Sequence, residues 1–133
     1  SAIASKLAGK IYNLRILKKN VEDSFQNITR FLLLQKKQIK VHPSKGKILT
    51  SLIFAVNNVP AALHKALGCF AINNVNMTKL ESYVNETFKQ AEFYVDIEGH
   101  IKDFNVISSL KEIKEYTRFV RILGTYYADK FRK

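Results

Sequence analysis

The 133-residue chain contains one cysteine, two prolines, one methionine and no tryptophan. A single cysteine excludes a disulfide framework and any zinc site built from four cysteines. The apolar runs, such as residues 52–56 (LIFAV), are far too short to cross a bilayer, and the first residues show no charged-then-apolar leader. We therefore expect a cytoplasmic protein that has no membrane partner.

Acidic residues are half as common as basic ones, 11 against 22, so the formal net charge is +11. Residues 1–47 hold 11 Lys and Arg residues but only two acids, Glu22 and Asp23, whereas the remainder holds 11 basic residues and nine acids. A basic balance is typical of nucleic-acid binding. Here the uneven distribution instead indicates a boundary, and the Lys-rich stretch 35–47, with Pro43 and Gly46, predicts a linker.

Motifs for metal and cofactor chemistry are also missing. The three histidines, His42, His64 and His100, show no metal-ligand spacing. No glycine-rich phosphate loop and no Ser/His/Asp arrangement is present. Cys69 lies in a predicted helix beside a phenylalanine, so we expect a buried structural thiol. The sequence therefore predicts no metal and no cofactor.

The basic first part contains two predicted elements. Apolar residues recur at helical spacing over residues 2–12. Residues 28–34 (ITRFLLL) form a compact run of β-branched, aromatic and aliphatic residues, which predicts a strand.

From residue 48 the pattern becomes regular. Four runs have strand character: residues 48–56, 77–84, 91–98 and 119–123. Helical patterns lie after the first and third of these runs. The order β-α-β-β-α-β predicts a ferredoxin-like fold, an antiparallel four-stranded sheet with two helices on one face. Alternation over residues 91–98 predicts one buried face and one wet face, with Tyr94 and Asp96 on the wet face.

The two predicted helices have recognisable beginnings. The helical pattern of the first covers residues 61–72. Pro60, directly before it, suits the first position of a helix. The second is expected to be capped by Asp103. Its expected apolar side consists of four residues at helical spacing: Phe104, Ile107, Leu110 and Ile113.

Several segments resemble the prephenate dehydratase family, and they occur in the same order and at the same spacing as in that family. Residues 57–67 (NNVPAALHKAL), 76–82 (NMTKLES) and 93–100 (FYVDIEGH) are similar to that family's ACT regulatory domain. Residues 20–23 (NVED) and 27–31 (NITRF) are similar to the end of its catalytic domain, including the Thr-Arg-Phe active-site motif. The resemblance covers nearly the whole chain.

The resemblance implies two domains. Residues 1–46 correspond to the end of a periplasmic-binding-protein-like α/β catalytic domain with its linker, and residues 47–133 to an ACT domain. The implied parent enzyme converts prephenate to phenylpyruvate, losing water and carbon dioxide, in L-phenylalanine biosynthesis. The rest of the catalytic domain is expected to lie outside this sequence, so we expect this chain alone to be inactive. ACT domains of the family pair, which implies a homodimer or tetramer.

The resemblance also implies the catalytic residues Thr29, Arg30 and Phe31. A positioned hydroxyl assists the departing oxygen, and a guanidinium grips a carboxylate through two hydrogen bonds. Neighbours on a strand point to opposite faces, so Thr29 ranks first and Arg30 has a supporting role.

A regulatory site for L-phenylalanine is implied between paired ACT domains. Its residues come from a helix-opening turn and a strand: Asn58, Pro60, Ala61, Ala62, Leu63, His64, Glu81 and Ser82. The chain departs from the family at three positions, with Ala61 replacing glycine, Tyr83 replacing arginine and Val84 replacing proline. Glycine in such a turn permits close approach to a ligand, so Ala61 is expected to narrow the site.

Two other classes of protein remain open. One is a stand-alone ACT-type regulator that binds an amino acid without catalysis. The other is a basic nucleic-acid binder that uses the exposed face of a ferredoxin-like sheet, with Tyr83 and Tyr94 as stacking residues. The sheet strands also carry acids, which repel phosphate, so we expect no nucleic-acid partner.

Overall fold

The computed structural model describes residues 1–24, 29–37, 40–42, 46–84 and 91–129. The chain divides into two compact units, Ser1–Gln35 and Lys36–Lys133, each described here by itself. Within the described ranges, no helix is long and apolar enough to span a membrane.

The first unit contains one short helix, α1 (Lys6–Ile11). It starts later than the sequence pattern suggests, because the Ser5 side chain accepts a hydrogen bond from the Ala8 N–H and caps the first turn. The strand expected over residues 28–34 is wrong for its described part, since residues 29–34 have no regular structure and are exposed. A strand needs a partner for its backbone groups, and residues 29–34 have none of the ladder pairings seen in the described chain.

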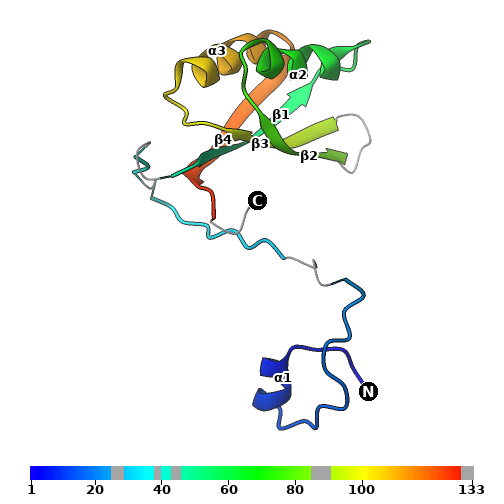
Figure 1. Ribbon diagram of the computed structural model, residues 1–133. Helices are drawn as coiled ribbons and strands as arrows, with labels where there is room; N and C mark the ends of the chain where they lie inside the picture. Colours follow the sequence, from blue (N-terminus) through cyan, green and yellow to red (C-terminus); the bar gives the residue numbers. More distant parts are fainter. Residues whose placement is uncertain (25–28, 38–39, 43–45, 85–90, 130–133) are drawn as a thin grey trace. The chain divides into compact units, whose positions relative to one another are not determined.

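The second unit is a layer of helices on a four-stranded sheet (Figure 1). Its elements follow the expected β-α-β-β-α-β order: β1 (Ile48–Val56), α2 (Ala62–Ile72), β2 (Met77–Val84), β3 (Ala91–Glu98), α3 (Phe104–Glu112) with the 3-10 turn η2 (Ile113–Glu115), and β4 (Thr117–Tyr127). The strand order is β2-β3-β1-β4, and every neighbouring pair is antiparallel. The predicted α+β fold with an antiparallel four-stranded sheet is therefore confirmed. The final strand is longer than expected.

The core lies between the sheet and helices α2 and α3. Leu52 and Phe54 of β1 alternate with residues of the opposite face, as the two-residue period of a strand requires. The Phe54 and Phe93 rings stack with their centroids 5.3 Å apart. Cys69 of α2 is buried in this core, as expected, and burial raises the pKa of its thiol, with nearby Glu112 adding to the shift.

The starts of both helices differ from expectation. Pro60 lies in the turn before α2 rather than in its first position, and Ala61 is the N-cap. Asp103 is the N-cap of α3, but its carboxylate accepts a hydrogen bond from the His100 N–H (2.7 Å), and no side-chain cap bond to the helix is formed. That contact ties the helix start to the Gly99 turn.

Half of the predicted apolar side of α3 is confirmed, because Ile113 is fully buried and Leu110 packs against the core, but the other two residues lie outside it. Phe104 is 81% exposed and Ile107 is 50% exposed, whereas Val106 and Ser109 are buried. Burying Ser109 costs little because its hydroxyl donates to the Asn105 carbonyl (2.8 Å). The helix therefore turns a partly polar stripe toward the core and leaves its aromatic residue outside.

Candidate regulatory site

The turn before α2 has an unusual backbone conformation at Ala61. Its φ is 60° and its ψ is 15°, in the left-handed region that glycine adopts without strain. Lys65 makes the first bond within the helix, from its N–H to the Ala61 carbonyl (3.0 Å), and the Ala62 N–H donates to the Val59 carbonyl (3.2 Å). The backbone thus keeps a glycine-like turn although the residue carries a methyl group.

The remaining turn residues are largely accessible. Asn58, Pro60 and Ala61 are exposed, as is His64 on the first turn of α2. Ala62 is buried and Leu63 packs against the core. The first turn of a helix presents backbone N–H groups that favour an anion such as a carboxylate.

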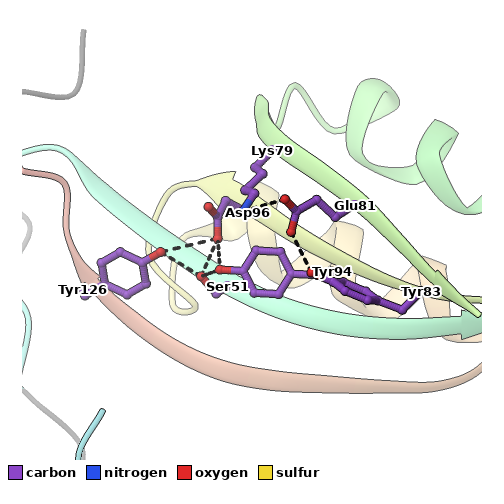
Figure 2. Close-up of polar contacts among 7 residues, drawn as sticks. All are labelled: Ser51, Lys79, Glu81, Tyr83, Tyr94, Asp96 and Tyr126. Carbon is purple, nitrogen blue, oxygen red and sulfur yellow. Dashed lines mark hydrogen bonds and ion pairs between the residues drawn. The ribbon is translucent and has the colours of Figure 1, made fainter. Parts of the chain in front are cut away.

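Glu81 of β2 is held by two neighbours on its own strand. Its Oε1 lies 2.9 Å from Lys79 Nζ, and its Oε2 accepts a hydrogen bond from the Tyr83 hydroxyl (2.9 Å) (Figure 2). The Lys79 hydrogen bond, and after it that of Tyr83, lowers the pKa of the carboxyl below its ordinary value. Both oxygens of this predicted effector-site carboxylate are therefore engaged by residues of the same strand. Ser82, the next residue, is exposed.

A buried polar cluster lies beside Glu81 on the sheet face opposite the helices, which we call the open face. Asp96 of β3 is fully buried, and its Oδ1 accepts hydrogen bonds from Ser51 Oγ (2.5 Å), Tyr94 Oη (2.7 Å) and Tyr126 Oη (3.4 Å). The expectation of a wet face is thus wrong at Asp96. The tyrosine side chains converge on the carboxylate and supply the hydrogen bonds that water would otherwise give.

Tyr94 connects this cluster to β2. Its ring lies 5.2 Å from Lys79 Nζ, in the geometry of a cation–π contact, while its hydroxyl bonds Asp96. Burial is the largest influence and raises the pKa of Tyr94 to about 12; the Ser51 hydrogen bond, next in size, lowers it, and the Asp96 hydrogen bond and the charges of Asp96 and Tyr126 raise it. The phenol therefore stays protonated and donating at physiological pH.

The two parts of the predicted regulatory site lie on different elements. Glu81 pairs with Tyr94, which pairs in turn with Ile53 across the sheet, whereas the Ala61 turn follows the end of β1. Within the described residues, no hydrogen bond or ion pair joins Glu81 to that turn. The turn and the strand are therefore two separate parts of the predicted site.

The predicted catalytic residues lie in the other unit. Thr29, Arg30 and Phe31 are all exposed, and Phe31 reaches 87%. Because these residues form no strand, the alternation argument that ranked Thr29 above Arg30 does not apply to this conformation. No group of three His, Cys, Asp or Glu side chains that could hold a metal occurs in the parts of the chain that are described.

Sequence reasoning missed the Ser51–Asp96 cluster. Ser51 sits inside an apolar run, and Asp96 alternates correctly for a solvent-facing position. One signal was available, because a serine within a buried strand needs a hydrogen-bond partner. That partner lies 45 residues away and became identifiable only with the strand register, which pairs Ser51 with Asp96.

Comparison with known proteins gives an independent view of both units. The family model described as prephenate dehydratase matches residues 1–39. A bifunctional N-acyl-homoserine lactone acylase/prephenate dehydratase from Komagataeibacter europaeus is 41% identical over 133 residues, covering 99% of this chain and 47% of its own length. A bifunctional chorismate mutase/prephenate dehydratase from Aquifex aeolicus is 42% identical over 128 residues, covering 94% and 34%. This chain is a homologue of the C-terminal part of prephenate dehydratase.

The homology to prephenate dehydratase covers both units but not a whole enzyme. The chain spans less than half the length of these two curated relatives. The fold is shared with a solved prephenate dehydratase from Arthrobacter aurescens, determined in complex with L-Phe (TM-score 0.60, 24% identity, 71% of this chain and 30% of that one). The resemblance seen in the sequence is therefore confirmed as homology.

Proposed function

We propose that this chain is the C-terminal part of a prephenate dehydratase, a carbon–oxygen lyase that converts prephenate to phenylpyruvate, water and carbon dioxide. In this proposal residues 1–46 are the end of the catalytic domain with its linker, and residues 47–133 are an ACT regulatory domain. One observation carries it: a prephenate dehydratase match over residues 1–39 is followed in the same chain by a β-α-β-β-α-β unit. That combination disfavours a stand-alone ACT regulator.

In the assembled enzyme Thr29 donates to the departing oxygen of prephenate, and Arg30 binds a substrate carboxylate. Phe31 lies beside them. Such chemistry needs an enclosed site in which donors keep fixed positions. Thr29 and Phe31 are exposed here, so we expect no sustained conversion of prephenate by this chain alone. A spectrophotometric assay of phenylpyruvate formation tests this, and sustained turnover would contradict it.

For the second unit we propose binding of L-phenylalanine between two copies. The effector carboxylate lies at the N–H groups opening α2, near Leu63 and His64, and the turn Asn58–Ala61 closes around it. Glu81 and Ser82 come from the other copy. The left-handed Ala61 supports this, because it keeps the backbone path of the glycine found in the family. Pairing of this kind implies a homodimer or tetramer, and we propose a cytoplasmic location.

Isothermal titration of L-phenylalanine into the chain tests the regulatory function, with L-tyrosine as the matched ligand. We expect heat of binding for L-phenylalanine and a weaker response for L-tyrosine, since Ala61 and Tyr83 leave less room than the family residues. Sedimentation in the presence and absence of ligand measures the oligomer. Absence of any binding at millimolar ligand would reject amino-acid sensing by this unit.

A further inference from the structure

The buried cluster on the open face has no part in the function proposed so far. Asp96 is fully buried, and Ser51 is 4% exposed. A carboxylate in such a place is costly unless several donors satisfy it. The Ser51 hydroxyl also lies 3.0 Å from Tyr94 Oη and 2.8 Å from Tyr126 Oη, so three hydroxyl groups from three strands meet at one carboxylate. The result is a rigid polar anchor in the sheet.

This anchor fixes the orientation of Tyr94. The Tyr94 hydroxyl donates to Asp96, and the phenol cannot turn away without giving up a charge-assisted bond. Its ring lies under the Lys79 ammonium, 5.2 Å from centroid to Nζ, and the same ammonium lies 2.9 Å from Glu81 Oε1. Figure 2 labels these four residues and draws the Tyr94–Asp96 hydrogen bond and the Lys79–Glu81 ion pair, which the ring contact between Tyr94 and Lys79 connects.

Glu81 itself is partly exposed on an edge strand, with 42% of its side chain accessible. A surface ion pair between two such side chains is ordinarily weak, because holding both side chains in one geometry costs entropy. The Tyr94 ring removes part of that freedom from Lys79 before any ligand arrives. A side chain held in advance binds a ligand with a smaller entropic cost.

We propose that Asp96 is a positioning residue for the amino-acid effector site: through Tyr94 and Lys79 it holds the Glu81 carboxylate in its binding orientation. This role rests on the proposed regulatory function, in which Glu81 belongs to the effector site. Asp96 does not touch the ligand. It acts on the affinity for L-phenylalanine by fixing the residues that lie between it and Glu81.

The test has one arm without ligand, using the pKa of Glu81 measured by carboxyl ¹³C NMR in the whole chain. Tyr94→Phe removes the bond to Asp96 without changing any charge. If positioning is correct, Lys79 and Glu81 separate more often and the Glu81 pKa rises toward its ordinary value. A Glu81 pKa that is unchanged or lower in Tyr94→Phe overturns the proposal.

The second arm measures L-phenylalanine affinity by isothermal titration in Tyr94→Phe and Asp96→Asn. Loss of one positioning bond predicts binding weakened by about 3- to 10-fold. Thr125→Val is the matched control, because it removes a buried hydroxyl that bonds Thr50 (3.0 Å) and lies on β4, which is not a neighbour of β2 in the sheet. An equal loss of affinity in Thr125→Val would assign the effect to general loosening of the sheet and overturn the proposal.

The two arms separate the two claims. If the unaltered chain binds no L-phenylalanine, the proposed regulatory function fails, and the NMR arm still decides whether Asp96 positions Glu81. If Asp96→Asn does not fold, Tyr94→Phe carries both arms, since its ring and its packing are retained.

Discussion

The two units of this chain contain similar side chains in opposite environments. In the first, Phe31 and Leu33 are 87% and 91% exposed, whereas in the second Phe54 and Leu52 are completely buried. The second unit closes a core between a sheet and two helices. The described part of the first unit contains one six-residue helix and no buried residue. Apolar composition therefore does not make a stable unit unless the elements that cover it are present.

The charge pattern teaches the same lesson. The net charge of +11 is typical of a protein with a polyanionic partner, yet the prephenate dehydratase family model matches residues 1–39 of the basic segment. If residues 1–46 are the end of a larger domain, as we propose, their charge balance need not be that of the whole domain.

The largest expected effect contrasts matched phenylalanines in the two units. Phe54→Ala removes a fully buried ring stacked on Phe93, and we expect a loss of about 3–5 kcal/mol in the free energy of unfolding. Phe31→Ala removes an exposed ring and should change it by less than about 0.5 kcal/mol. Urea denaturation followed by circular dichroism measures both. Equal effects would mean that the first unit also has a core.

A glycine pair extends the comparison. Gly99 has a φ of +120°, and a methyl group there would lie 2.8 Å from Val106 Cγ2. We expect Gly99→Ala to lower the free energy of unfolding by about 2 kcal/mol. In Gly9→Ala of α1 the nearest atom lies 3.5 Å away, an ordinary contact, so sheet unfolding should not change. Thermal melts of both variants test this, and an unaffected Gly99→Ala would contradict the turn geometry.

Ala61 gives a smaller effect of opposite sign. A left-handed alanine is strained by about 1–2 kcal/mol, and glycine would remove this strain. Glycine would also raise the conformational entropy of the unfolded chain, which offsets up to about 1 kcal/mol of the gain in stability. We therefore expect Ala61→Gly to stabilise the second unit by about 0.5 kcal/mol. Ala71→Gly, in the same helix with an ordinary backbone, should destabilise it by about 0.5–1 kcal/mol. Destabilisation by both would show that Ala61 is not strained.

The last effect appears only at alkaline pH and is absent at neutral pH. The pKa of Tyr94 is raised to about 12, above the ordinary value of 10, so the unfolded chain releases this proton first. The stabilising contribution of the protonated phenol is complete below pH 10 and is lost as the pH rises toward 12. Phenolate absorbance of the unaltered chain minus that of Tyr94→Phe should show a component titrating near 12. A component near 10 would mean that the phenol is not held by the cluster.

Local pattern was sufficient for most of the second unit. β1, β2 and β3 have the predicted bounds, because alternation and turn residues are properties of neighbouring residues. Only part of the buried face of α3 could be chosen in this way, since Leu110 and Ile113 were predicted correctly and Phe104 and Ile107 were not. Phe104 and Val106 each begin a series of residues at helical spacing. Packing against the sheet buries Val106 and leaves Phe104 exposed, which the spacing alone does not predict.

The candidate site divides along the same line. The turn at Ala61 and the strand at Glu81 were predicted as parts of the site because they resemble family segments. The Ser51–Asp96 contact depends on register across the sheet, which no single segment contains. The strand expected at residues 28–34 failed for a related reason, because its propensity had no partner strand in the described chain.

We propose that the second unit binds L-phenylalanine without any contribution from the first unit. The most direct test of this central claim is calorimetric titration of L-phenylalanine into residues 47–133 beside the whole chain. We predict the same dissociation constant for both, to within a factor of about two, with the same stoichiometry. Binding by the whole chain alone, or by neither, would contradict the claim.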